Sequence, residues 1–282
     1  MDCTANSHDD GRERNLFLYV DEQLLHIAMH QNMAPNAPGW RNPGQAPSPL
    51  MQLHAALDDF ARSRSQRSGE RFHEPLQRRF EVIARTTPCA TAVSFNGRCL
   101  NYGDLDEQAD ALALHLQARG LAPCSFCVVD LEPSLAQVRA ILAILKAGAV
   151  WLQIDARLGP RAVAAVLAAL APAFRVSRGA GQGGIAGAAL TTVYCDEDAA
   201  DLPYGWADEI PVGARTLACA NATLAPDGNV CIDVRTHRAL GELLDQAPLV
   251  NPQQVTGLDP GGLWRPLSRG TPLTIRSQVV QG

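Results

Sequence analysis

From Phe72 to about Leu240 the sequence alternates short apolar segments with segments of helical periodicity. The apolar run Ala149–Ile154 suits a strand that is buried on both faces. The run Ser134–Ala147 repeats apolar residues every three or four positions, which is the period of a helix with one buried side. Strands that alternate with helices pack as an α/β fold. The sequence therefore predicts a largely parallel sheet flanked by helices.

Local signals place the individual elements. Asn96-Gly97 accepts the positive φ angles of a type I′ turn and predicts a hairpin between Thr91–Phe95 and Arg98–Tyr102. Asn101 is the expected cap of the following helix, and Gly120 its expected end. Pro160 suits the first turn of a further helix. Other predicted strands are Cys127–Leu131, Phe174–Ser177, Thr192–Cys195, Arg215–Ala222 and Val230–Val234.

The two ends of the chain lack this regularity. Residues 1–71 are expected to form a leader and linker, partly disordered, with a short helix at Leu16–Met29. Residues 246–282 are rich in proline and glycine and are expected to form an irregular tail. The predicted globular domain is thus 72–245.

Composition excludes several function classes. The net charge is −5 in 282 residues, which argues against a nucleic-acid partner because such binding needs clustered cations. No segment is long and apolar enough for a spanning helix, so we expect no membrane partner. The first residues do not resemble a secretory signal, and the eight cysteines form no compact framework. A cytoplasmic location is predicted.

Leu217–Leu240 reads LACANATLAPDGNVCIDVRTHRAL. It resembles the phosphate-loop segment LAYxxYTSGSTGxPKGVxxxHRAL of the amino-acid adenylation domains of nonribosomal peptide synthetases. LNYGDL at Leu100–Leu105 and LKAGAVWLQID at Leu145–Asp155 resemble the family's first two core motifs, L(T/S)YxEL and LKAGxAYVPxD, in the same order. The resemblance, to the AMP-binding, adenylate-forming superfamily, implies the first part of its large N-terminal subdomain.

The family carries out ATP-dependent amino-acid adenylation with ATP and Mg²⁺, but the centre of this loop departs from the pattern. Only Thr223 and Gly228 remain from the loop core, and they predict a vestigial phosphate loop. Cys231 stands where the family has a lysine, and Asp227 places a carboxylate where phosphate should pack. Leu224 and Ala225 add side chains at the same place. We therefore expect no bound ATP or metal and assign no catalytic residue.

The resemblance also implies residues beyond Leu243, among them an acidic residue for the substrate amine and a catalytic lysine. None of those motifs is found in Asp245–Gly282. The sequence thus predicts a truncated, degenerate adenylation-domain-like protein without independent adenylating activity. It would be either a pseudoenzyme of a secondary-metabolism peptide synthetase system or a non-functional remnant. Two alternatives stay open. The chain could be an interaction module that docks on a synthetase or an accessory protein, or half of a split adenylating enzyme.

Other motifs favour structural roles. Lys146 is expected to be a solvated charge at a helix end and Asp155 a turn former. His237 is expected to be a helix-start residue or a part of the family's sequence pattern. Cys124 and Cys127 have the spacing of half a zinc site, but no second pair accompanies them, so structural cysteines are predicted. Gly179–Gly184 fits G-x-G-x-x-G, yet the following segment is too short for a helix that binds a dinucleotide. A surface connection is expected there.

Overall fold

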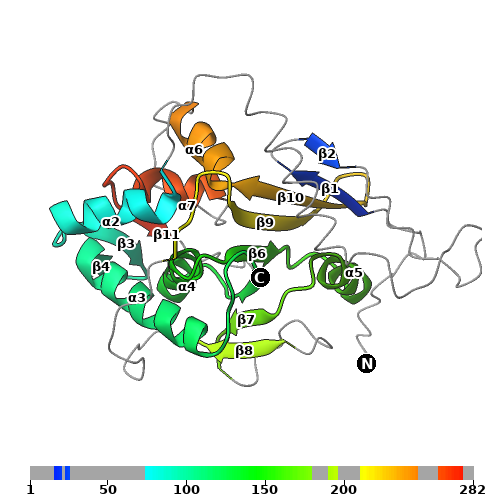
Figure 1. The fold of residues 1–282 in the computed structure, drawn as a ribbon, viewed down its shortest axis with the longest axis horizontal. Coiled ribbons are helices and arrows are strands. Elements are labelled where there is room, and N and C mark those ends of the chain that lie inside the picture. Colours follow the sequence, from blue (N-terminus) through cyan, green and yellow to red (C-terminus); the bar gives the residue numbers. More distant parts are fainter. Residues whose placement is uncertain are drawn as a thin grey trace, which may run out of the picture.

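The structure is a computed structural model of the 282-residue chain. It describes residues 16–20, 23–25, 74–179, 190–195, 210–246 and 260–275. Two sheets and six helices lie in these ranges, and they are arranged in layers (Figure 1).

The main sheet has eight strands in the order β2-β1-β10-β9-β6-β5-β7-β8. The five strands from β9 to β8 run parallel to one another, β10 is antiparallel to β9, and β1 is parallel to β10. This confirms the predicted, largely parallel α/β sheet. The strands are β1 (Leu16–Val20), β2 (Gln23–Leu25), β5 (Phe126–Asp130), β6 (Val150–Ile154), β7 (Phe174–Ser177), β8 (Thr191–Tyr194), β9 (Leu217–Leu224) and β10 (Val230–Thr236).

Helix ends follow the sequence signals. Asn101 accepts a hydrogen bond from the Asp104 N–H at 2.7 Å, and Ser134 accepts one from the Gln137 N–H at 3.3 Å. These side chains satisfy N–H groups that have no partner inside the helix. The helices are α2 (Leu76–Thr86), α3 (Tyr102–Ala118), α4 (Leu135–Lys146), α5 (Pro160–Leu170), α6 (His237–Gln246) and α7 (Pro260–Leu267).

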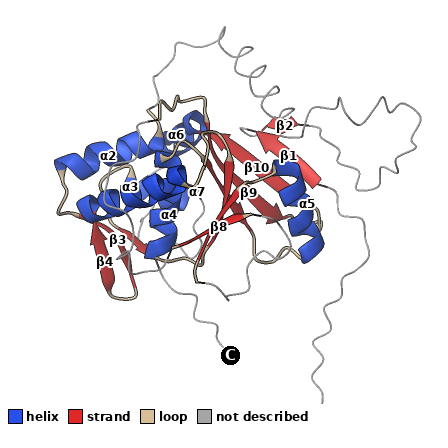
Figure 2. Ribbon diagram, turned by 60° about the horizontal axis from the view of Figure 1, so that its bottom comes forward, coloured by secondary structure: helices blue, strands red, loops and turns tan. Residues whose placement is uncertain are grey.

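The main sheet has a separate apolar core on each face, because successive side chains of a strand point to opposite sides. In β5, Cys127 and Val129 belong to the core shared with α2, α3, α4, α6 and α7. Phe126 and Val128 belong to the core shared with α5 and β1. Figure 2 shows α2, α3 and α4 on one side of the sheet and α5 on the other. All four of these β5 side chains are buried.

A second sheet of three strands, in the order β11-β3-β4, lies beside the first core. β3 (Thr91–Phe95) and β4 (Arg98–Asn101) form the predicted hairpin, and Asn96 and Gly97 have φ angles of +49° and +79°. These angles are those of the type I′ turn that the dipeptide predicts. The third strand, β11 (Leu273–Ile275), pairs with β3 in parallel.

The helix predicted at Leu16–Met29 is wrong for its described residues. Leu16–Val20 is the strand β1, and Gln23–Leu25 is the strand β2 that pairs with it. LFLYV is rich in aromatic and branched residues, and its burial alternates strictly along the segment. Alternate burial is the period of a strand with unequal faces, so the neighbouring strand β10 decides the conformation.

The predicted irregular tail is also wrong between residues 260 and 275. These residues form α7 and β11, and Leu263, Trp264 and Leu267 of α7 are each 1% exposed. The Tyr102 hydroxyl donates its hydrogen bond toward the carbonyls of Leu267 and Thr271, both at 3.3 Å. Burial of apolar side chains, rather than local propensity, forms this helix despite its two prolines and two glycines.

Candidate functional site: the hairpin of β9 and β10

Two long strands carry the segment that resembles a phosphate loop. β9 and β10 pair antiparallel, and the last pair before the loop joins Leu224 to Val230. β6 pairs with the other side of β9, and β1 pairs with the other side of β10. The loop 225–229 is therefore carried by two strands that have no free edge.

The loop closes as a type I turn followed by a bulge. The Gly228 N–H donates to the Ala225 carbonyl at 2.9 Å, and the Ala225 N–H donates to the Asn229 carbonyl at 2.9 Å. Gly228 has a φ of +85°, which a glycine adopts without the steric cost of a Cβ. Pro226 presets the φ of the second turn position. This is the hydrogen-bond pattern of a hairpin with a left-handed residue after its turn.

The loop conformation was not predicted, although the sequence carries a signal for it. Pro226-Asp227-Gly228 between two apolar strands is a turn pattern with a known physical basis. The residues that depart from the phosphate-loop pattern therefore also favour a closed hairpin turn.

Asp227 stabilises the turn with its carboxylate. Oδ1 accepts from the Asn229 N–H at 3.0 Å, and Oδ2 accepts from Asn229 Nδ2 at 2.8 Å. These hydrogen bonds, the one from the backbone N–H first, lower the pKa of Asp227 below its usual value. The exposed tip of the loop therefore carries a negative charge at neutral pH.

The two predicted site residues lie on this hairpin. Thr223 is an exposed residue of β9 and pairs with Cys231 of β10, while Gly228 occupies the turn. Burial, and next the charge of Asp227, raise the pKa of the Cys231 thiol above its usual value. Cys231 is therefore a neutral thiol at the position where the family pattern has a cation.

Asp155 directly follows β6 and forms hydrogen bonds with β9 near the base of the loop. Its N–H donates to the Ala222 carbonyl at 2.9 Å, and its carboxylate accepts from the side chain of Arg157, with Oδ2 to Nη2 at 2.6 Å. Hydrogen bonds from Arg157 first, and also one from the Leu224 N–H, lower the pKa of Asp155. The Leu158 N–H donates to the Asp155 carbonyl at 3.0 Å, which confirms the predicted turn.

Lys146 is not the solvated charge that the sequence predicts. Its side chain is 5% exposed, and Nζ lies 2.7 Å from Asp110 Oδ1, 2.8 Å from Asp106 Oδ1 and 3.6 Å from Glu81 Oε1. Burial alone would lower the pKa of Lys146, but the charge and hydrogen bonds of Asp106 and Asp110 outweigh it and raise the pKa. The expectation failed because α2 and α3 bring carboxylates over the end of α4, which only the tertiary structure decides.

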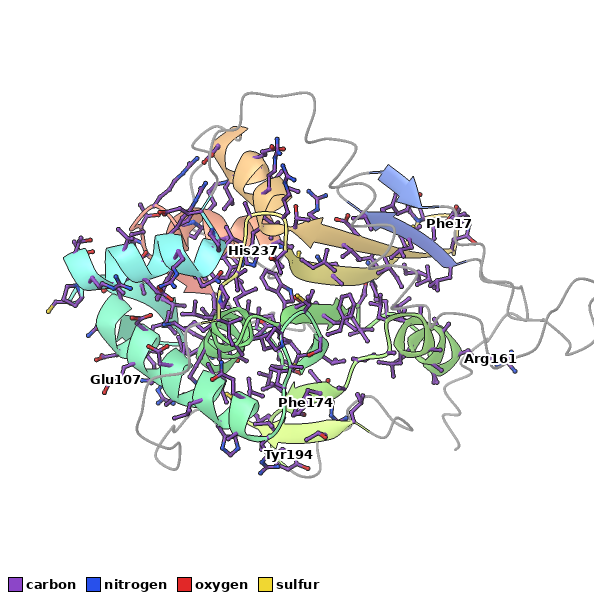
Figure 3. All side chains as sticks on the ribbon, in the orientation of Figure 1. Phe17, Glu107, Arg161, Phe174, Tyr194 and His237 are labelled. Carbon is purple, nitrogen blue, oxygen red and sulfur yellow. The ribbon has the colours of Figure 1, made fainter. Side chains whose placement is uncertain are left out.

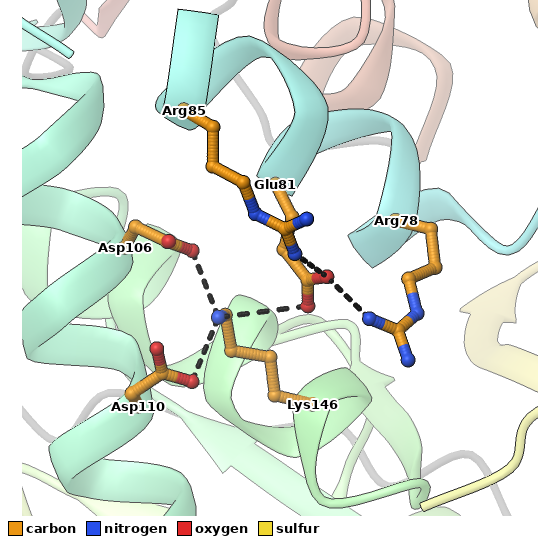
Figure 4. A network of polar contacts seen from close by, with 6 residues as sticks. All are labelled: Arg78, Glu81, Arg85, Asp106, Asp110 and Lys146. Carbon is orange, nitrogen blue, oxygen red and sulfur yellow. Dashed lines mark hydrogen bonds and ion pairs between the residues drawn. The ribbon is translucent and has the colours of Figure 1, made fainter. Parts of the chain in front are cut away.

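This cluster balances its own charge (Figure 4). Glu81 Oε2 lies 2.9 Å from Arg78 Nη1 and 3.4 Å from Arg85 Nη2. Three cations and three carboxylates thus join α2, α3 and α4 at the edge of the first core. Because each charge has an opposite neighbour, the cluster fits a structural role.

His237 begins α6, as predicted, and is 1% exposed. Its Nδ1 accepts a hydrogen bond from the Leu76 N–H at 3.3 Å. The ring therefore caps the first turn of α2, although the two residues are 161 positions apart in the chain (Figure 3). Burial lowers the pKa of His237 to about 4. The imidazole is therefore neutral at pH 7 and has a structural role here.

The remaining motifs occupy other places. Cys127 is buried in β5, where burial raises its pKa, and Cys124 precedes that strand with a φ of +60°. Within the described ranges, no group of three or more His, Cys, Asp or Glu side chains is placed to hold a metal ion. Gly179–Gly184 lies outside the described residues except for Gly179. None of the helices in those ranges has the length and apolar character needed to cross a membrane.

Comparison with known proteins covers the first two motifs and the start of the third. The profile of the AMP-binding enzyme family matches residues 80–219. Phosphinothricin tripeptide synthetase PhsC of Streptomyces viridochromogenes is 34% identical over 181 residues. Surfactin synthase subunit 3 of Bacillus subtilis is 33% identical over 131 residues. This chain contains part of an AMP-binding adenylation domain.

The matched adenylation segment is a small part of the related proteins. The match to PhsC covers 63% of this chain but 17% of PhsC. The match to surfactin synthase subunit 3 covers 46% of this chain but 9% of that protein. Solved structures share the adenylation fold at lower identity. The N-terminal subdomain of Klebsiella oxytoca NpsA has a TM-score of 0.62 at 22% identity, and the match covers 72% of this chain and 55% of that one. The nonribosomal peptide synthetase FmoA3 has a TM-score of 0.63 at 22% identity and covers 86% of this chain.

Proposed function

We propose that this chain is an adenylation-domain-like protein that does not adenylate amino acids by itself. The hydrogen bonding of the loop 225–229 supports this. Ala225, Gly228 and Asn229 donate their N–H groups within the loop, and Pro226 has none. A loop that binds phosphate needs several N–H groups turned toward the ligand, which this closed turn does not offer.

The charges at the hairpin support the same proposal. Asp227 is ionised at neutral pH, and a carboxylate repels a phosphate. Cys231 supplies no cation to offset that repulsion. Thr223 and Gly228 are then the remains of a phosphate site, and the residues around them do not fit ATP with Mg²⁺. As a pseudoenzyme, the chain would serve a secondary-metabolism peptide synthetase in the cytoplasm.

Amino-acid-dependent exchange of labelled pyrophosphate into ATP tests this proposal. We expect no exchange above background with any proteinogenic amino acid and no heat of ATP binding by calorimetry. The matched control restores the family pattern with Leu224→Ser, Ala225→Gly, Pro226→Ser, Asp227→Thr and Cys231→Lys. If the variant binds ATP and the natural chain does not, the defect lies in the loop. Exchange by the natural chain would overturn the proposal.

A second proposal follows from the size of the relatives. The chain spans 17% of PhsC and 55% of the NpsA subdomain, so a second polypeptide could dock on it or complete it as half of a split enzyme. The test mixes the chain with a polypeptide that carries the rest of an adenylation domain. Exchange that requires both chains supports the split enzyme, and co-elution without exchange supports docking. Separate elution without exchange would exclude both.

A further inference from the structure

The strand β1 lies far outside the family match yet belongs to the main sheet. The match covers residues 80–219, whereas β1 is formed by Leu16–Val20. All five of its residues pair in parallel with consecutive residues of β10, from Val230 to Val234. Figure 1 shows β1 and β2 along the outer side of β10. A segment about two hundred residues away in the chain therefore covers the edge of the strand that follows the loop.

The side chains of β1 anchor it on one face of the sheet. Leu16, Leu18 and Val20 are 6%, 6% and 3% exposed and belong to the same core as the β10 residues Ile232 and Val234. The alternate residues, Phe17 and Tyr19, are half-buried on the other face. Phe17 pairs with Cys231, the residue at the position of the family's lysine. The anchor is thus three apolar side chains and one row of main-chain hydrogen bonds.

The register of β1 places this anchor at the base of the loop. Val230 is the first residue after the loop; it pairs with Leu224 on one side and with Leu16 on the other. If the turn is to open, the pair of Leu224 and Val230 must separate. Because β1 binds the outer edge of β10 from Val230 onward and its apolar side chains lie in the core, β10 can separate from β9 only if β1 leaves β10 or moves out of the core with it.

We propose that β1 is a lock strand that holds the β9–β10 hairpin and its loop in the closed form. Release of β1 is the step that frees β10 and lets the turn 225–229 open. A strand of five residues makes few contacts, so its local release costs less free energy than opening of the central strands. The inference does not depend on whether the loop binds nucleotide.

A disulfide tests the placement of β1 in the full-length chain. Phe17→Cys puts a thiol opposite the natural Cys231, and neighbouring strands lie about 4.8 Å apart, within the usual Cα separation of disulfides. We expect mild oxidation to link positions 17 and 231 within one chain, as mapped in the non-reduced peptide digest. Leu18→Cys is the matched control, because its side chain points to the opposite face and should not link to Cys231. A link between two chains as the main product, or none, would overturn the proposal.

Amide hydrogen exchange tests the lock itself. In the Phe17→Cys variant, we expect the oxidised form to exchange the amides of β10 and the loop at least about tenfold more slowly than the reduced form. The amides of the central strand β5 should differ by less than about twofold between the two forms. Equal exchange of β10 in the two forms would refute the lock.

Leu18→Asp provides the opposite perturbation by placing a charge in the core under β1. We expect exchange of β10 and the loop to become at least about tenfold faster, with β5 unchanged. If exchange speeds up in β5 as well, the variant has lost its fold, and the comparison of oxidised with reduced Phe17→Cys decides. Faster exchange confined to segments other than β10 and the loop would contradict the proposal.

Discussion

The buried imidazole of His237 predicts a stability that depends on pH. Its Nδ1 accepts from the Leu76 N–H, an arrangement that only the neutral ring permits, and burial lowers its pKa from 6.5 to about 4. Between these two values the unfolded chain binds a proton that the folded chain does not. The contribution of His237 to the free energy of unfolding is therefore fully present above pH 6.5 and is lost as the pH drops toward 4.

The size of this effect follows from the two pKa values. A difference of one pKa unit corresponds to about 1.4 kcal/mol, so the shift of His237 from 6.5 to about 4 amounts to about 3 kcal/mol. Most of it, about 2.5 kcal/mol, should be lost by pH 4.5. For a domain of marginal stability, this is a large part of the total.

Urea unfolding at pH 7, 6, 5 and 4.5 measures the effect against His237→Asn. The Asn Oδ1 lies close to the position of His Nδ1 and can accept from the Leu76 N–H, but it does not titrate. We expect the natural chain to lose about 2.5 kcal/mol more than His237→Asn between pH 7 and 4.5. His115→Gln is a control, because His115 is only partly buried and its replacement should leave most of this difference in place. Parallel curves for the natural chain and His237→Asn would refute the reasoning.

Two further substitutions test the loop turn and the charge cluster by urea unfolding at pH 7. Gly228→Ala meets no atom within 4 Å but keeps a φ of +85°, so it should cost about 1 to 2 kcal/mol. Gly213→Ala is the control, because its φ lies outside the left-handed region and its Cβ would meet only Thr216 Oγ1, at 3.8 Å; equal effects would contradict a left-handed turn. Lys146→Met leaves three carboxylates without their buried cation and should cost about 3 to 5 kcal/mol. Arg85→Met, at a side chain that is 69% exposed, should change stability by less than about 1 kcal/mol, and a similar loss in both variants would argue against a buried cluster.

Local signals were sufficient where one short segment contains its own partner. Asn96-Gly97 predicts the hairpin of β3 and β4, and Asn101 and Ser134 lie at the helix starts that the pattern indicates. Pro226-Asp227-Gly228 belongs to the same class, although its turn was not predicted. In each case the interacting groups lie within one short segment of the chain, so the sequence contains the whole interaction.

Non-local contacts explain the failures. β1 is a strand because β10 lies beside it, and α7 is a helix because its apolar side lies on the first core. Lys146 is buried because α2 and α3 bring Glu81, Asp106 and Asp110 to the end of α4. No window of sequence around these residues contains their partners, and propensity is weak compared with burial.

The sequence by itself determined the family, the α/β class and the residues that replace the phosphate loop. The spacing of apolar residues, the helix caps and the order of the motifs carry that information, because each can be read from residues that lie near one another in the chain. Only the tertiary structure decided that an N-terminal strand binds beside the base of the loop, and that His237 and Lys146 are buried. Those properties depend on which distant segments exclude water from a side chain, and burial is a property of the assembled layers.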